Sequence, residues 1–190
     1  KVVADLKLIN TKFKDAYLIQ ADIHSDNRGF FMESYNSKKF SEYGLDMVFV
    51  QDNHALSHQS GTLRGLHYQL NPFAQTKLVR VTKGSIYDVI VDIRKNSPTY
   101  GQWEGFTLTA ENKLQLLVPK GFAHGYCTLE NDTEVQYKVD NWYSPEHDRG
   151  IAWNDPILNI TWPVENPILS IKDQKHPTLE KAENNFIWEG

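Results

Sequence analysis

Two histidines lie in strand-like segments where their imidazoles could transfer protons. His67 follows Arg64 in the segment 61–69, and His124 is close to Gly121 and Gly125 in the segment 119–126. Histidine titrates near neutral pH and is the most common general base in enzymes. The glycines around His124 would let a ligand approach closely. A histidine hydrogen-bonded inside a sheet for structural reasons fits either segment as well.

The spacing of Arg64 and His67 requires a local irregularity in the strand. Residues three apart point to opposite faces of a regular strand, because its side chains alternate. Gly65 lies between them, and a glycine inside a strand often marks a β-bulge. We therefore predict a bulge at Gly65 that turns Arg64 and His67 toward the same side.

Other kinds of catalytic chemistry lack their usual patterns. No His-x-His occurs, and His54 and His58 have a helical spacing within a strand-like segment, so a metal site of the usual β-barrel type is not indicated. Cys127 has no basic neighbour and is interpreted as a small core residue. No Gly-x-Ser-x-Gly elbow, phosphate loop or dinucleotide fingerprint occurs. We predict neither a metal nor an organic cofactor.

Short strands separated by turns would have to position these residues. We predict strands at residues 17–21, 30–35, 47–57, 62–70, 77–82, 85–94, 103–109, 114–119, 123–130 and 133–142. This regular spacing is typical of a sandwich or barrel rather than of βαβ units. One helix is expected at residues 37–43, capped by Ser37 and ended by Gly44. From residue 163 we expect an irregular tail with a short helix near 179–184.

The segment 86–93 has two different faces. One face is apolar, and the other mixes apolar and acidic side chains: Tyr87, Val89, Val91 and Ile93 against Ile86, Asp88, Ile90 and Asp92. A mixed face suits a lumen that holds a ligand. The alternative is a solvent-exposed face that carries two isoleucines. We predict the lumen.

Composition narrows the class of protein. The chain has 190 residues, a net charge of −4 and one cysteine. No basic stripe indicates nucleic-acid binding, although local arginines and lysines could still hold an anionic substrate. A single cysteine cannot form a disulfide within the chain, which favours a reducing, cytoplasmic location. No apolar run is long enough for a membrane span, and no signal-peptide pattern occurs. The sequence begins at Lys1 rather than Met, which is compatible with missing terminal residues.

With these residues assembled, the sequence resembles the dTDP-4-dehydrorhamnose 3,5-epimerase family along nearly its whole length. The similar blocks are 26–33, 49–54, 63–69, 77–80, 88–94, 119–125, 137–138, 153–155 and 169–173. The resemblance implies an all-β, cupin-like jelly-roll barrel of antiparallel strands that forms one domain over residues 1–190. It also implies a homodimer in which N-terminal strands, within roughly residues 1–60, cross to the partner's sheet. Residues 163–190 would be the irregular tail.

The resemblance further implies a substrate and a set of site residues. The substrate would be dTDP-4-dehydro-6-deoxy-D-glucose, with no metal or organic cofactor. By position, His67 corresponds to the catalytic base and Asp173 to the carboxylate paired with it. Tyr137 corresponds to the acid on the other face of the sugar, and Lys77 to a lysine near the carbonyl oxygen. The nucleotide-sugar cleft would be lined by Arg28, Phe31, Glu33, Gln51, Asn53, Arg64, His124 and Tyr143.

The chemistry of such a sugar fits these assignments. The protons at C3 and C5 both flank the C4 ketone, so removing either one gives an enolate at O4. A base and a donor that stabilises the enolate are the minimum requirement. A second group must return the proton on the opposite face. Arg28 and Arg64 could bind the diphosphate, and Phe31 or Tyr143 could stack on the thymine.

Three alternatives remain at this point. A relative could epimerise only C3 or only C5, or act on another nucleotide sugar. A non-catalytic sugar-binding barrel could have the same cleft. A metal-dependent cupin isomerase or oxygenase is the third, and the absence of His-x-His argues against it.

Overall fold

Antiparallel strands make up nearly all of the regular structure in the computed structural model, which describes residues 6–190. The elements in chain order are β1 (Lys7–Asn10), β2 (Tyr17–Gln20), β3 (Ile23–Asp26), β4 (Gly29–Met32), α1 (Ser37–Glu42), β5 (Gln51–Ser57), β6 (Leu63–Gln69), β7 (Lys77–Lys83), β8 (Ser85–Asp92), β9 (Trp103–Thr109), β10 (Gln115–Val118), β11 (Phe122–Thr128), β12 (Thr133–Val139), β13 (Asp148–Gly150) and the 3₁₀-helix η1 (Asp173–Lys175). The prediction of an all-β chain is confirmed. The strands β1, β3 and β13 were not predicted.

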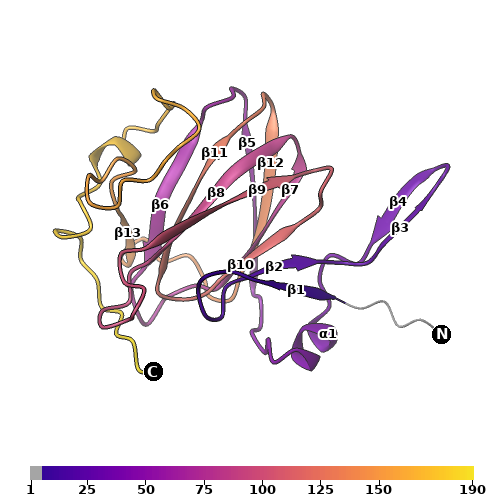
Figure 1. The fold of residues 1–190 in the computed structure, drawn as a ribbon, viewed down its shortest axis with the longest axis horizontal. Coiled ribbons are helices and arrows are strands. Elements are labelled where there is room, and N and C mark those ends of the chain that lie inside the picture. Colours follow the sequence, from indigo (N-terminus) through magenta and orange to yellow (C-terminus); the bar gives the residue numbers. More distant parts are fainter. Residues whose placement is uncertain (1–5) are drawn as a thin grey trace.

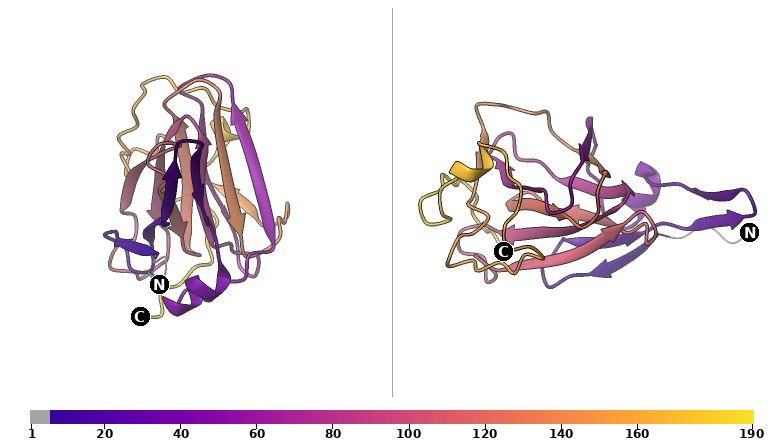
Figure 2. Two further views of the ribbon diagram at one scale, coloured as in Figure 1. Left: turned by 90° about the vertical axis from the view of Figure 1, so that its right-hand side faces the viewer. Right: turned by 90° about the horizontal axis from the view of Figure 1, so that it is seen from above.

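The strands form two large sheets and a separate hairpin (Figures 1 and 2). One sheet has the order β1-β2-β10-β7-β12-β5, the other β13-β6-β11-β8-β9, and β3 pairs with β4. Sequence neighbours such as β11 and β12 belong to different sheets, so the chain passes back and forth between the layers. This arrangement places β6 and β11 of one sheet opposite β7 and β12 of the other.

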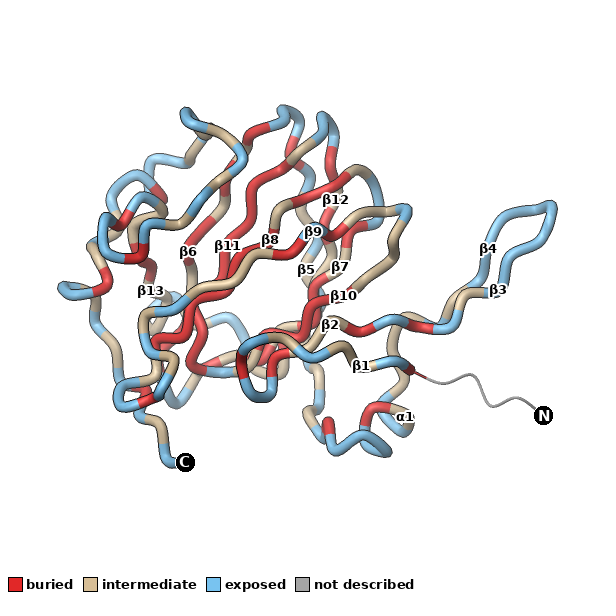
Figure 3. Tube along the Cα trace, in the orientation of Figure 1, coloured by how far each residue is buried: buried red, intermediate tan, exposed pale blue. Residues whose placement is uncertain are grey.

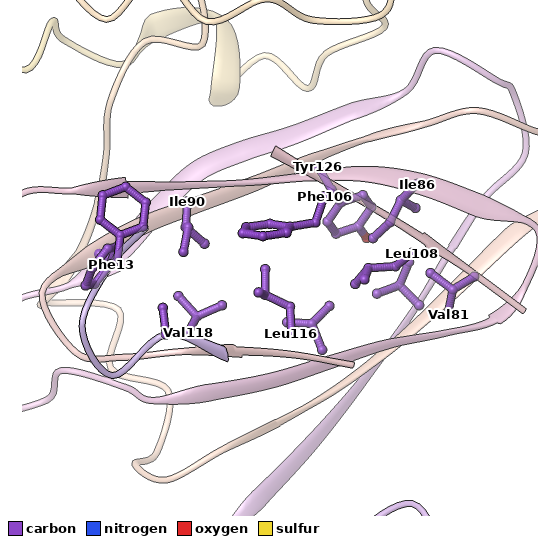
Figure 4. Close-up of a cluster of buried hydrophobic side chains, with 13 residues drawn as sticks. Phe13, Val81, Ile86, Ile90, Phe106, Leu108, Leu116, Val118 and Tyr126 are labelled. Carbon is purple, nitrogen blue, oxygen red and sulfur yellow. The ribbon is translucent and has the colours of Figure 1, made fainter. Parts of the chain in front are cut away.

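The two sheets enclose an apolar core. Side chains from both layers interdigitate there, including Ile86 and Ile90 of β8, Phe106 of β9, Leu116 of β10 and Val135 of β12. Figure 4 shows the labelled members pointing toward one another between the strands. Burying each such side chain contributes roughly 1.5–3 kcal/mol, which keeps the two layers together and gives the site a rigid frame.

Both faces of β8 are buried. Ile86, Asp88 and Ile90 point between the sheets, where the two isoleucines belong to the core. Val89 and Val91 pack on the outer side against the C-terminal segment. The mixed face is buried, so the solvent-exposed alternative is wrong. Its isoleucines pack in the core and none of its side chains lines the cavity that opens between the two sheets, so the predicted ligand-holding lumen is not confirmed for this face. The apolar outer face is explained by the tail that covers it.

The C-terminal tail is irregular as predicted, but its helix lies elsewhere. Residues 179–184 form no helix, so that prediction is wrong. Ala182 donates to the Thr178 carbonyl in a single turn, while the Leu179 amide donates to the Asp155 carboxylate at 2.7 Å. This side-chain contact ties the segment to the loop that contains Asp155 and competes with further helical turns. The short helix is η1, which begins at Asp173.

The predicted N-terminal helix is confirmed as α1, with a different cap. Asn36, rather than Ser37, accepts hydrogen bonds from the amides of Lys38 and Lys39. Asparagine caps a helix as well as serine does. In residues 6–190 no helix is long and apolar enough to cross a membrane. The cytoplasmic location stays a prediction.

The hairpin β3–β4 projects away from the two sheets (Figures 1 and 2). Most of its residues are exposed, as the pale blue in Figure 3 shows. Phe30 and Phe31 are 57% and 70% exposed. Two adjacent exposed phenylalanines on a projecting hairpin are unusual for a surface that faces only water.

Candidate active site

A cavity of about 430 Å³ opens between the two sheets. The strands β6 and β11 supply Arg64, His67 and His124, while β7 and β12 supply Lys77 and Tyr137 from the other layer. The tail closes one side with residues 168–170, 172 and 173. An adjoining cavity of about 260 Å³ shares four of these side chains, those of His67, Lys77, Tyr137 and Lys172. It is lined also by Gln51, Asn53 and Tyr143.

The structure therefore brings together nine of the twelve residues that the sequence singled out. The three others, Arg28, Phe31 and Glu33, lie on or next to the hairpin β3–β4 and line neither of these cavities. Arg28 pairs with Asp26 at 2.6 Å, and Glu33 pairs with Lys39 of α1 at 2.9 Å. Within one chain the hairpin does not reach the cavity. Its contribution to a neighbouring subunit stays a prediction.

The predicted bulge in β6 is confirmed. His124 of β11 is opposite His67 and Tyr126 is opposite Arg64, so two residues of β6 face one residue of β11 between these pairs. Gly65 has a φ of 132°, and a Cβ on it would lie 2.6 Å from the Gly125 Cα. Glycine at 65 permits this close approach of the two strands. The bulge turns both Arg64 and His67 toward the cavity.

His67 is hydrogen-bonded to the carboxylate of Asp173. The distance between His67 Nε2 and Asp173 Oδ1 is 2.6 Å. The His67 side chain is 36% exposed and that of Asp173 only 5%. An ionised carboxylate only accepts, so Nε2 carries a proton and Nδ1 has a free lone pair. This tautomer is the one that a general base needs, because the carboxylate also stabilises the imidazolium that forms.

The backbone of the tail holds Asp173 in place. Thr62 and Ile168 form an isolated parallel β-bridge, and the Leu63 amide donates to the Ile168 carbonyl at 2.9 Å. These contacts join the tail to the start of β6. Asp173 Oδ2 accepts from the Gly65 amide at 3.2 Å. Burial raises the pKa of Asp173, but hydrogen bonds and charge from His67, with the Gly65 amide and His176, outweigh burial and lower the pKa to about 2. The carboxylate is therefore ionised at neutral pH.

A third group, His176, also contacts this carboxylate. The possible metal-ligand atoms of His67, Asp173 and His176 lie within 4.8 Å of one another. Two imidazoles and a carboxylate are a set of ligands that can bind a divalent metal. The two Nε2 to Oδ1 distances are 2.6 and 3.0 Å. Ligand atoms around a tetrahedral zinc lie roughly 3.3 Å apart, since each bond is about 2.0–2.1 Å. The spacing here fits direct hydrogen bonds better than coordination.

Lys77 and Tyr137 face His67 from the opposite sheet. Lys77 Nζ lies 5.9 Å from the centre of the Tyr137 ring. Burial lowers the pKa of Lys77 to about 8, against the opposing effect of the Asp88 and Asp148 carboxylates. Burial raises the pKa of Tyr137, partly offset by Asn53 and the Arg64 guanidinium. The neutral phenol is thus the state that can donate a proton.

A second buried histidine–carboxylate pair lies beside the cavity. His124 Nε2 and Asp88 Oδ1 are 2.5 Å apart, and both side chains are buried. Burial lowers the pKa of His124, with Asp88 acting in the opposite direction. Among the described residues, Asp88 Oδ2 has no hydrogen-bond partner. His124 is therefore oriented by Asp88, whose charge also acts on Lys77.

Comparison with known proteins decides between the kinds of barrel that could hold such a site. A model of the family described as dTDP-4-dehydrorhamnose 3,5-epimerase matches residues 10–181. The chain belongs to this family. It is therefore an epimerase, and its two-sheet architecture is the cupin-like fold of these enzymes.

Individual relatives agree with the family match. The dTDP-4-dehydrorhamnose 3,5-epimerase of Shigella flexneri is 53% identical over 169 residues, which cover 88% of this chain and 93% of the relative. A crystal structure of the Bacillus anthracis enzyme with TDP and PPi bound is 57% identical, with a TM-score of 0.90, and the match covers 91% of this chain and 99% of that one. A Legionella pneumophila enzyme in complex with dTDP-4-keto-L-rhamnose is 45% identical, with a TM-score of 0.89, covering 93% and 94%.

Several residues of the epimerase site were missed by sequence reasoning. Asp148, Lys172 and His176 lie in loops or at strand ends with no periodic pattern around them. Lys172 forms an ion pair with Asp148 at the rim of the cavity. For Lys172 and His176 the local signal was their closeness in sequence to Asp173, which Lys172 precedes directly and His176 follows by three residues. Asp148 had no such signal.

The activity of the epimerase is expected to fall as pH rises through about 8, where Lys77 loses its charge. An uncharged lysine would no longer stabilise negative charge in the cavity. Lys77→Arg keeps a cation at all accessible pH values. The fall in kcat at high pH should therefore begin about one pH unit or more higher in this variant than in the wild type. The measurement is the pH profile of kcat for both proteins. Identical high-pH limbs would remove Lys77 as the group responsible.

Proposed function

We propose that this epimerase inverts C3 and C5 of dTDP-4-dehydro-6-deoxy-D-glucose to give dTDP-4-dehydro-L-rhamnose, with His67 as the base. The observation that carries the proposal is the hydrogen bond between His67 Nε2 and Asp173 Oδ1 at the wall of the cavity. It leaves Nδ1 of a partly exposed histidine free to take a proton. The dTDP-4-keto-L-rhamnose found in the Legionella relative supports the same substrate class.

The two sheets supply groups on opposite sides of the substrate. His67 comes from β6, and Lys77 and Tyr137 come from β7 and β12 of the facing sheet. His67 removes the proton next to the C4 ketone, and the charge that develops on O4 is stabilised by Lys77. Tyr137 then returns a proton on the other face. Inversion needs this second group, because return of the proton by His67 would restore the original centre.

Enolate protonation is downhill, so even a phenol with a raised pKa can serve as the donor. Arg64 is oriented toward the cavity by hydrogen bonds to Ser57 Oγ at 3.1 Å and to the Leu56 carbonyl at 3.0 Å. Its guanidinium has further donors for a diphosphate oxygen. Tyr143, Gln51 and Asn53 line the adjoining cavity, where the nucleotide would lie.

The proposed functional unit is a homodimer of single-domain subunits. The exposed hairpin β3–β4 would place Arg28, Phe31 and Glu33 at the cavity of the neighbouring subunit, with Arg28 on the diphosphate and Phe31 on the base. The support is the exposure of Phe30 and Phe31 together with the distance of this hairpin from its own chain's sheets (Figure 2). Among residues 6–190 neither phenylalanine belongs to a core cluster, and Phe30 contacts Lys113, whose Nζ lies 4.4 Å from the ring centre.

Mixing two impaired variants, assayed at a substrate concentration too low to saturate Arg28→Ala, tests the exchange of hairpins. Arg28→Ala is expected to weaken substrate binding roughly 10–100-fold, because a hydrogen-bonded ion pair with phosphate is lost. Denaturing and refolding it together with His67→Asn should recover activity, since one site of each mixed dimer has both an intact His67 and an intact Arg28. Each mixed dimer is expected to have about half the activity of a wild-type dimer, because one of its two sites is intact. No recovery, with mixed dimers present by mass, would contradict the exchange.

The proposed reaction is tested by incubating the protein with dTDP-4-dehydro-6-deoxy-D-glucose and assigning the product by NMR. The L-rhamno configuration at both C3 and C5 is expected, with and without a chelator. Inversion at a single carbon would identify a C3-only or C5-only epimerase. Binding of the nucleotide sugar without any turnover would overturn the proposed reaction.

A further inference from the structure

The carboxylate of Asp173 has a second imidazole bound to it. Oδ1 lies 2.6 Å from His67 Nε2 and 3.0 Å from His176 Nε2, while Oδ2 accepts from the Gly65 amide at 3.2 Å. The His176 side chain is 9% exposed, and it does not line the cavity. A carboxylate that only accepts must receive a proton from each nitrogen. His176 is therefore a donor to Asp173 and not a contact for the substrate.

The fold leaves a specific space for the His176 ring. Gly150 of β13 pairs with His67 of β6. A Cβ on Gly150 would lie 2.3 to 2.5 Å from three atoms of the His176 ring, closer than side-chain carbons approach in proteins. Gly150 has no unusual φ that would itself require glycine. The reason for glycine here is the ring that occupies the space of its missing side chain.

The two imidazoles also contact one another. The centres of the His67 and His176 rings are 5.7 Å apart with an interplanar angle of 79°, an edge-to-face arrangement. Together with the Gly150 contact, this packing fixes the His176 ring on the side of Asp173 away from the cavity. A merely space-filling residue would not need a hydrogen-bond donor at this position.

We propose that His176 is a positioning residue for the proposed reaction, and that its hydrogen bond to Asp173 holds the carboxylate in the orientation that fixes the His67 ring. The inference rests on the proposed function. Without His176, Asp173 keeps two donors, from His67 and Gly65, and can rotate about its terminal bond. The ring of His67 is then less well directed at the substrate. Since His176 does not line the cavity, binding should be unaffected.

The test compares two substitutions of His176 in steady-state kinetics. His176→Phe keeps a planar ring but has no donor, and kcat is expected to fall roughly 10–100-fold with KM unchanged, the range given by loss of one hydrogen bond to a charged group. His176→Gln places an amide N–H at about the reach of Nε2 and should stay within about threefold of the wild type. Lys175→Gln, on the exposed side of the same short helix, is the matched control.

A substitution at Gly150 tests the same contact without changing the histidine. Gly150→Ala would push the ring away from Asp173 and should lower kcat to a similar extent as His176→Phe. In a protein that already carries His176→Ala, the added methyl group has room, so Gly150→Ala should then cause no further loss. This non-additivity is the signature of a shared contact. All assays contain a chelator, so that metal binding to the histidines plays no part.

The outcomes separate the inference from the function on which it rests. A wild-type protein without turnover would contradict the proposed reaction. With an active wild type, an unchanged kcat in His176→Phe would overturn the role of His176, and so would a loss in His176→Gln as large as that in His176→Phe. Thermal denaturation identifies variants that do not fold. If His176→Phe does not fold, Gly150→Ala and His176→Gln are compared with the wild type instead. Equal kcat values in all three proteins would also overturn the role of His176.

Discussion

His67→Asn is expected to lower kcat for epimerisation roughly 10²–10⁴-fold, the usual contribution of a general base. Asparagine is a smaller polar side chain whose amide reaches about as far as Nδ1, so it has no nitrogen that can accept a proton from carbon and the contact of Nε2 with Asp173 is lost as well. The substrate should still bind, because the groups that contact the nucleotide are unchanged. The measurement is kcat by NMR of the sugar protons, together with titration of dTDP to confirm binding.

His58→Asn is the matched control for this substitution. His58 is exposed on the surface, where it pairs with Asp132 at 3.0 Å, and it lines neither cavity. Its kcat should equal that of the wild type. A His67→Asn protein that is folded, binds dTDP and turns over at the wild-type rate would remove His67 as the base.

Asp173→Asn is expected to cost roughly 10³–10⁴-fold in kcat, the size seen when the carboxylate of a histidine–carboxylate pair becomes an amide. The amide removes the negative charge that stabilises the imidazolium. If its NH₂ group faces His67, it also requires Nε2 to accept, which places the ring proton on Nδ1 and blocks the base. The kinetic comparison with Asp173→Glu shows whether charge alone is sufficient.

The same substitution has a second, independent consequence for stability. The pKa of Asp173 is lowered to about 2 in the folded protein. A depressed carboxyl pKa contributes stability above the unfolded value, which is near 4, and this contribution is lost as pH falls through about 2. Asp173→Asn should therefore lose less stability than the wild type between about pH 4 and pH 2. Urea unfolding at these pH values measures the difference, and equal losses would contradict the lowered pKa of Asp173.

Local patterns in the sequence predicted the strands and their orientation well. Alternation along 86–93 correctly placed Asp88 between the sheets, because β8 is buried on both faces and its polar residues stand out. Gly65 predicted the bulge, since the requirement that Arg64 and His67 share one side left few other solutions. Short strands such as β13 were missed because three residues carry too little periodicity.

Contacts between distant segments were beyond local reasoning. Asp173 is 106 residues from His67, and only the family resemblance connected them. The bridge between residues 62 and 168 brings the tail to β6, and no turn or repeat in the sequence announces it. His176 was missed for the same reason, since its partner Gly150 lies on a strand that was not predicted. The site thus depends on an irregular tail whose path is set by tertiary contacts.

The central claim is that His67 removes a proton next to the C4 ketone, and isotope exchange tests it most directly. The wild type and His67→Asn are incubated with dTDP-4-dehydro-6-deoxy-D-glucose in heavy water, and deuterium at C3 and C5 is followed by NMR. The wild type should incorporate deuterium at both carbons, and His67→Asn at neither on the same timescale. Incorporation in folded His67→Asn at the wild-type rate would contradict the account.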